Sequence, residues 1–385
     1  MQIKMYEIPS KRLAGYAESP SVSCIQVRKK SVLVGTAFSA PLLQEIHFSD
    51  DFSKATKVED QELDSTLEGD AVAILNGLRS SGTGDTVLAV LHPGSISPFI
   101  KNIFGRNLAK KSGTELMEFL AGDDQGMGFW LRHSLIQVSK GEFTARHFRE
   151  AGVMWDGVWM GDFVFGISGS TLIREPYLYL NFEKRETLRK ELFSNFGVHW
   201  SEDGIIWALG QNMRLVRFVS TESKAKPTPL KLPGAQSDLP ESGFALSSYS
   251  NNDGWLYGTS GGSKILFRVR RNPITQEEEL QELHKFEDRI TGLTVLETEE
   301  KSTLYWTTEA ESGAQLHRAA LPKPEDQELM PAVPEFETVG LIGDFKTVSA
   351  LTAGTDGHSL WLGEGRMGSV LPRSDNLRIL RISDI

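Results

Sequence analysis

The chain has 385 residues, of which 39% are hydrophobic, and this is enough apolar material for a large buried core. Its 41 Lys and Arg residues against 51 Asp and Glu residues give a formal net charge of −10, which disfavours binding to the phosphate backbone of nucleic acids. The single cysteine, Cys24, excludes an intramolecular disulfide framework, and the sequence holds no apolar run of 18 residues that would predict a membrane-spanning helix.

The first 20 residues mix charged and apolar side chains and lack the apolar core of a signal peptide. Together with the lone cysteine, this predicts a soluble, cytoplasmic protein without nucleic-acid or membrane partners. Cys24 lies in an alternating stretch, residues 22–27, with no His or Asp partner beside it. We therefore interpret it as a small buried side chain rather than a nucleophile.

The first predicted elements are strands. Gln2–Ile8 alternates apolar and polar residues, and Ser31–Thr36 and Thr86–Val90 are short apolar stretches with β-branched residues. The next comparable stretch comes late, because 71 residues separate Leu88 from Trp159. We predict a helical insertion in this interval, at residues 92–122, where it could cover one end of a central channel.

A repeated unit begins at residue 156. It consists of an Asp-Gly pair followed by a short strand with an aromatic residue, as in residues 203–210, 253–258 and 356–363. Asp-Gly favours a hairpin turn because Gly accepts positive φ. The tryptophans of the unit are separated by 48, 48, 51 and 55 residues, close to the length of one four-stranded propeller blade, and they are Trp159, Trp207, Trp255, Trp306 and Trp361. We interpret them as packing between blades.

The remaining segments complete the pattern. Further apolar strands follow the repeats, at residues 213–218, 264–269 and 315–319. The last unit, from Val348 to Ile382, is one strand short, and Gln2–Ile8 can supply it. The sequence therefore predicts an all-β fold with one domain over residues 1–385, a single seven-bladed β-propeller closed by the N-terminal strand.

Three smaller predictions concern the surface. We expect a short helix at Lys184–Leu192 and an exposed polar loop at Thr221–Glu241. The one basic cluster, Arg268, Arg270 and Arg271, is short and follows an apolar strand pattern. We favour a solvated strand edge over an anion-binding site for it.

No local catalytic motif is present: the sequence lacks a nucleophile elbow, a zinc-binding His pair, a phosphate loop and paired cysteines. Propeller enzymes can assemble a site from loops of different blades, so polar residues at comparable places are the candidates. We predict His199, Glu309 and Glu364 as catalytic residues, with a satisfied core histidine and solvated loop charges as the alternatives. The predicted substrate-binding residues are Trp155, Trp200, His92, Gln211 and Arg366.

Two family resemblances add to this interpretation. The stretch Leu351–Glu364 resembles the repeated turn-and-strand unit of streptogramin lyase-like propellers, and Leu304–Glu309 echoes it. The chain is also similar, at the level of the blade pattern, to the gluconolactonase and senescence-marker group, in which Leu67–Asp70 corresponds to an early metal motif but lacks its proline. The second resemblance implies a metal-free enzyme of secondary metabolism more than a calcium-type lactonase.

Our main functional hypothesis is a small-molecule-binding propeller. It would be an enzyme acting on an apolar or aromatic metabolite in the central channel, by cyclisation, cycloaddition or lyase-type chemistry. No cofactor is predicted, and a divalent metal is kept as an alternative. A non-catalytic scaffold for protein partners is the second hypothesis, because propellers present broad faces to other proteins.

Overall fold

The computed structural model describes residues 1–12, 20–28, 30–37, 39–41, 43–61, 74–80, 86–92, 133–139, 142–147, 154–160, 163–168, 171–176, 186–190, 199–201, 204–219, 222–236, 245–322, 333–365 and 376–385. Within these ranges the regular structure is antiparallel β-sheet with one short 3-10 turn, η4 (Gln211–Met213). No helix in the described ranges has the length and apolar character needed to cross a membrane.

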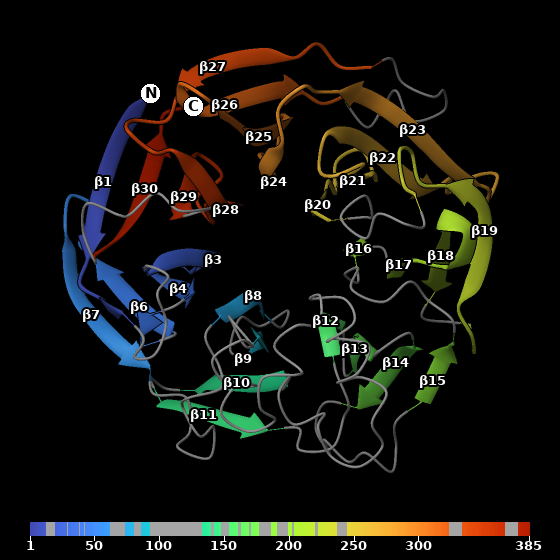
Figure 1. The fold of residues 1–385 in the computed structure, drawn as a ribbon, viewed down its shortest axis with the longest axis horizontal. Helices are drawn as coiled ribbons and strands as arrows, with labels where there is room; N and C mark the ends of the chain where they lie inside the picture. Colours follow the sequence, from blue (N-terminus) through green and yellow to red (C-terminus); the bar gives the residue numbers. More distant parts are fainter. Residues whose placement is uncertain are drawn as a thin grey trace, which may run out of the picture.

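The strands form four-strand meanders arranged around a common centre (Figure 1). We call each meander a blade and name it by its innermost strand. The innermost strands are β3 (Ser21–Val27), β8 (Ile74–Ser80), β12 (Met154–Met160), β16 (His199–Ser201), β20 (Ser247–Tyr249), β24 (Ile290–Glu297) and β28 (Thr347–Ala353). Their hairpin partners are β4 (Ser31–Ala37), β9 (Thr86–His92), β13 (Phe163–Ser168), β17 (Ile205–Leu209), β21 (Leu256–Ser260), β25 (Ser302–Ala310) and β29 (Ser359–Gly365).

The third and fourth strands of each blade lie further from the centre (Figure 1). The third strands are β6 (Leu43–Phe48), β10 (His133–Ser139), β14 (Thr171–Pro176), β18 (Arg214–Val219), β22 (Ile265–Arg271), β26 (Gly313–Ala320) and β30 (Leu377–Ser383). The outer strands are β7 (Ala55–Gln61), β11 (Glu142–His147), β15 (Glu186–Arg189), β19 (Lys226–Lys231), β23 (Glu278–Lys285), β27 (Glu337–Leu341) and β1 (Gln2–Ile8). A two-residue ladder joins β2 (Lys11–Arg12) to β5 (Ser39–Ala40). The chain is a β-propeller.

The outer strand of the β28 blade comes from the other end of the chain. β1 pairs antiparallel with β30 over seven positions, from Gln2 opposite Ser383 to Ile8 opposite Leu377. Its alternation of buried and exposed residues turns Tyr6 and Ile8 toward the interior, while Ile3 and Met5 stay exposed. The predicted pairing of the N-terminal strand with the last unit is present in the structure.

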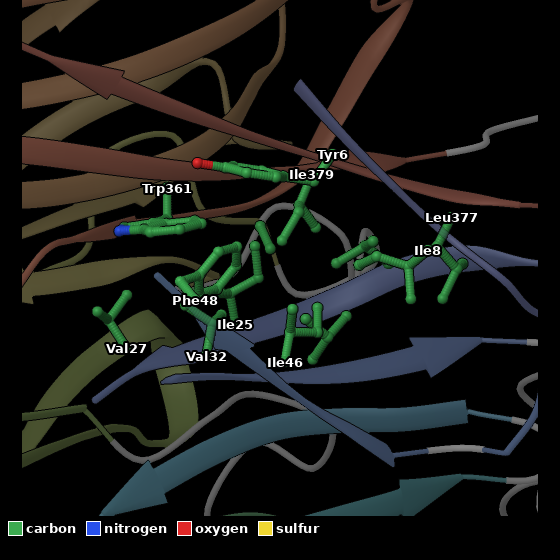
Figure 2. Close-up of a cluster of buried hydrophobic side chains, with 13 residues drawn as sticks. Tyr6, Ile8, Ile25, Val27, Val32, Ile46, Phe48, Trp361, Leu377 and Ile379 are labelled. Atoms are coloured by element: carbon green, nitrogen blue, oxygen red, sulfur yellow. The ribbon is translucent and has the colours of Figure 1, made fainter. Parts of the chain in front are cut away.

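The core at this point joins the first and last parts of the chain. Figure 2 shows Tyr6, Ile8, Leu377 and Ile379 of the β28 blade packed with side chains of β3, β4 and β6. The ring of Tyr6 stacks on Trp361 with centroids 5.9 Å apart, and its hydroxyl donates a 2.5 Å hydrogen bond to the carbonyl of Phe52. Burial of this apolar surface stabilises the contact between the β28 and β3 blades.

The tryptophans of the repeat are core residues, as predicted, wherever their side chains are described. Trp207, Trp255, Trp306 and Trp361 are among the largest fully buried side chains. The basic cluster differs from the prediction of a solvated edge, because Arg268 is fully buried and its guanidinium lies 4.7 Å from the Trp255 ring, with that of Arg270 at 4.3 Å. Gln281 accepts hydrogen bonds from Arg268, and Glu279 pairs with Arg270, so polar partners on β23 offset the cost of burying both charges.

Three further predictions of local structure were wrong. Lys184–Leu192 contains the strand β15 instead of a helix, and Thr221–Glu241 contains the strand β19, because each blade requires an outer strand to cover its third. The predicted turn at Asp156-Gly157 lies inside the strand β12. β12 pairs with β13, and only residues 161–162 separate the two strands in the sequence. The predicted helical insertion, residues 92–122, lies outside the described residues beyond His92, between β9 and β10.

The Asp-Gly turn between β28 and β29 behaves as the sequence indicates. Gly357 has a φ of 68°. Asp356 accepts hydrogen bonds from the backbone N–H of His358 at 2.9 Å and from the Ser359 hydroxyl at 2.8 Å, and it pairs with Arg381 at 2.9 Å. Burial would raise the pKa of Asp356, but these bonds together lower it below the ordinary value of 3.8.

We predict that Asp356→Asn lowers the free energy of unfolding by about 1 kcal/mol at pH 7. A carboxyl group whose pKa is lower in the folded chain stabilises the fold above its unfolded pKa and loses this effect as the pH falls. The difference in the free energy of unfolding between wild type and Asp356→Asn should therefore be largest at pH 7 and should shrink below pH 3.8. Urea unfolding across this pH range measures it, with Glu311→Gln in the exposed turn between β25 and β26 as the control.

Candidate functional site

Four innermost strands share an irregularity near their first residues. The pairing of each with its second strand shifts by one residue, between Val22 and Cys24 in β3, Met154 and Asp156 in β12, Ile290 and Gly292 in β24, and Val348 and Ala350 in β28. Such a bulge leaves one residue of the innermost strand without a ladder partner and can re-aim its side chain. These residues are Ser23, Trp155, Thr291 and Ser349.

Hydroxyl groups of the innermost strands join consecutive blades. The backbone N–H of Val295 donates a 2.8 Å hydrogen bond to Ser248, and that of Ala353 donates a 3.2 Å bond to Thr294. Ser349 donates to the carbonyl of Val22. Three consecutive junctions, from the β20 blade to the β3 blade, therefore use a Ser or Thr side chain to satisfy a backbone group of the next blade.

The side chains that remain partly exposed on these strands are small and uncharged. In β3, β20, β24 and β28 they carry hydroxyl, thiol, amide or aliphatic groups, apart from one Tyr and one Glu. The Glu is Glu297 at the end of β24, and its carboxylate accepts bonds from Ser250 and Asn251. On these four strands the described side chains therefore offer hydrogen bonds but no cluster of charges that would hold a metal ion.

Cys24 was predicted to be a small buried residue, and it is only partly buried. Its thiol forms no disulfide, lies on β3 beside the bulge, and accepts a 3.9 Å hydrogen bond from the hydroxyl of Ser23. Because it is the one cysteine of the chain, a thiol reagent can report specifically on this innermost strand.

The two predicted catalytic carboxylates do not occupy equivalent places. In the β28 blade, Glu364 lies opposite Val348, the residue just before the register shift of β28. In the β24 blade, the residue at the same place is Thr308, which lies opposite Ile290. Glu309 lies one residue further along β25, and its backbone N–H bonds to the carbonyl of Arg289. Because side chains alternate between the faces of a strand, the offset turns the two carboxylates to opposite faces of their blades.

Glu364 is held by an arginine on the neighbouring strand. Arg378 donates to both carboxylate oxygens of Glu364 and also pairs with Asp344 at 2.8 Å. The hydrogen bonds that Arg378 donates to Glu364 contribute most to raising the pKa of Arg378, so the guanidinium stays charged. A bidentate pair of this kind orients both groups.

For the other predicted site residues the structure gives the position in the strands. His92 ends β9 opposite Ile74, while His199 and Trp200 begin β16 opposite Trp207 and Ile206. Trp155 is the bulged residue of β12. Gln211 begins the η4 turn, and Arg366 lies outside the described residues.

Sequence reasoning missed the bulge positions because it aligned the repeats on tryptophan. The structure aligns Gly35-Thr36, Thr307-Thr308 and Gly363-Glu364 at the register shift. Trp306 lies one residue before the pair at the shift, and Trp361 lies two residues before it. An alignment on the tryptophans therefore places the bulges of the two blades one residue out of register. A small residue followed by a Thr or Glu, at the end of β4, β25 and β29, is the signal that could have located three of the four bulges; the β12 bulge lies opposite Ile167 and Ser168 and lacks it.

A scan against protein-family models gives no match, and a search of curated proteins gives none either. Solved structures do match, in 684 chains. Two are structures of the extracellular domain of BT4673 from B. thetaiotaomicron, described as a one-component and as a hybrid two-component system, with TM-scores of 0.54 and 0.52 and identities of 9% and 13%. Each alignment covers 97% of this chain, which spans about two fifths of the length of those chains, 42% and 39%.

A third similar structure belongs to a mitotic checkpoint complex. Its TM-score is 0.55 at 11% identity, and the alignment covers 99% of this chain and 91% of that chain. At such low identity the likeness concerns the fold alone. It agrees with the arrangement of the described strands: the chain has the architecture of a β-propeller.

Proposed function

We propose that this chain is a seven-bladed propeller, closed by β1, that binds a small uncharged molecule at its innermost strands. Support for the blade number comes from the innermost strands β3, β8, β12, β16, β20, β24 and β28, and support for closure from the ladder between β1 and β30. The largely uncharged, hydroxyl-bearing character of the side chains described on β3, β20, β24 and β28 carries the proposal on the ligand.

The chemistry of these side chains defines the ligand class. The hydroxyl groups of Ser23, Thr291 and Ser349 at the bulges bond to Cys24, Thr307 and Val22, and each oxygen can still accept a hydrogen bond from a ligand. Leu351 and Ala353 offer apolar contacts. A charged ligand would lose its hydration there without gaining a counter-ion. An uncharged molecule with apolar surface and a few hydrogen-bonding groups fits best.

We propose a metal-independent reaction at this site, a cyclisation, cycloaddition or lyase-type step. Shape and orientation can promote such chemistry without a local motif, which agrees with the resemblance to lyase-like and senescence-marker propellers. Since Arg378 engages Glu364, His199 and Glu309 are the better candidates for proton transfer. Glu364 would act as a positioning residue.

Cys24 provides the test. A panel of uncharged metabolites is screened for compounds that raise the melting temperature of the protein, and the rate of Cys24 modification by N-ethylmaleimide is then measured with and without each stabilising compound. A ligand at the innermost strands should slow the modification at least tenfold at saturation, because it covers the thiol. Mass spectrometry measures the rate directly.

A matched control places the thiol elsewhere. In a Cys24→Ser, Ser312→Cys variant the new cysteine lies in the exposed turn between β25 and β26, and ligands should not slow its modification. If a stabilising compound leaves the rate at Cys24 unchanged, it binds away from the innermost strands and the proposal is wrong.

A scaffold role is the second candidate, and exposed apolar residues on β1 favour it. Met1, Ile3 and Met5 are 60%, 45% and 48% exposed on the outer strand of the β28 blade. An apolar strip of this kind is typical of a protein contact. Failure of every uncharged compound to bind, together with partner binding that Ile3→Lys and Met5→Lys abolish, would favour the scaffold.

A further inference from the structure

Three potential metal ligands meet on the outer half of the β3 blade, away from its innermost strand (Figure 1). Glu45 on β6 lies directly opposite Glu59 on β7, and His47 follows Glu45 by two residues on the same face. The imidazole nitrogen and one oxygen of each carboxylate all lie within 4.8 Å of one another.

This arrangement brings together atoms that repel one another unless a cation lies between them. Two carboxylates directly opposite each other on neighbouring strands are destabilising. Nε2 of His47 is shielded from solvent, makes no hydrogen bond, and lies 3.5 Å from Oε2 of Glu59. Nε2 of His47 is therefore a shielded ring nitrogen beside two carboxylates, an arrangement that a bound metal ion would satisfy.

The surroundings of Glu45 resemble the support of a metal ligand. Its side chain is buried, 6% exposed, and accepts a 2.5 Å hydrogen bond from Ser31 and a 3.3 Å bond from Arg28. Ligating carboxylates are commonly held in this way by neighbouring donors. Such bonds leave the second carboxylate oxygen available for a cation.

Lys57 is the competing cation. It contacts Glu59, and this hydrogen bond is the main cause that lowers the pKa of Glu59 below its ordinary value. The Lys57 side chain is 65% exposed, so it can leave the carboxylate with little loss of packing. Lys57 would then limit the affinity of the group for a metal without preventing binding.

We propose that Glu45, His47 and Glu59 bind a divalent transition-metal ion of the Zn²⁺ class. One imidazole and two carboxylates are ligands that Zn²⁺ and Co²⁺ accept, and three protein ligands leave a position for water. Alkaline-earth ions are disfavoured, because Mg²⁺ and Ca²⁺ prefer oxygen ligands alone.

Titration calorimetry of the full chain with Co²⁺ and with Zn²⁺ tests the proposal. We expect one ion per chain, and His47→Gln and Glu59→Gln should each lower the affinity at least tenfold. His358→Gln changes an exposed histidine outside the group and should bind as the wild type does. Lys57→Met should bind more tightly, because it removes the competing cation.

Melting temperatures without metal establish that each variant is folded, and added Zn²⁺ should raise the melting temperature of the wild type but not of His47→Gln. Absence of a stoichiometric site in the wild type, or binding that survives both His47→Gln and Glu59→Gln, overturns the proposal.

Discussion

Ile8→Ala is expected to lower the free energy of unfolding by about 2–5 kcal/mol, a range typical of Ile→Ala substitutions in protein cores. Ile8 is 1% exposed and lies opposite Leu377, in the core that joins β1 and β30 to the β3 blade. The substitution leaves a cavity at the point where the N-terminal strand holds the last blade. Urea unfolding followed by tryptophan fluorescence measures the loss.

Ile3→Ala is the matched control on the same strand. Ile3 lies opposite Ile382 but is 45% exposed, so its truncation should change the free energy of unfolding by less than about 0.5 kcal/mol. If the two substitutions have equal effects, β1 does not stabilise the protein through the inward face that the structure describes.

Gly363→Ala is expected to destabilise the contact between the β28 and β3 blades by about 1–3 kcal/mol. A Cβ atom added at Gly363 would lie 2.3 Å from Cγ1 of Val22 and 3.4 Å from Cβ of Ala350. Both neighbours are buried and belong to innermost strands, so neither can move freely. Urea unfolding again gives the magnitude.

A double-mutant cycle makes this prediction specific. Val22→Ala removes the atom of closest approach, so the combined variant should lose about 1 kcal/mol less than the sum of the single losses. Val32→Ala truncates a valine of the same core that is not among the nearest neighbours of Gly363, and its effect should add to that of Gly363→Ala. Additivity in both pairs would contradict the contact.

Much of the fold could be predicted from local sequence pattern. Gln2–Ile8 was predicted within its observed bounds, and residues 31–36, 348–353 and 377–382 each lie inside the strand that the structure shows. These segments alternate or are continuously apolar, and in the β28 blade Asp356-Gly357 marks the turn. In such segments local preference and tertiary packing agree.

The errors came from segments where local preference was weak. The outer strand β15 has only four residues, and β19 contains two prolines and two lysines. Both become strands because the third strand of their blade offers an unpaired edge. For the candidate site, the bulge depends on the register between two strands, which no single segment encodes. The roles of His199, Trp200 and Arg366, the cytoplasmic location and the absence of a cofactor stay predictions.

The pairing of β1 with β30 also has a consequence for how the protein forms. The ladder joins Gln2 to Ser383, so β1 can pair only after the distant β30 has been made. Until then Tyr6 and Ile8 lack Trp361, Leu377 and Ile379, which form one side of their core, and the segment between the two strands is a very long loop. Contacts of such long sequence separation form slowly because their entropic cost comes before their gain. We therefore expect the pairing of β1 with β30 to be a late and rate-limiting step of folding, and the unpaired β1 to be exposed to chaperones and proteases until it forms.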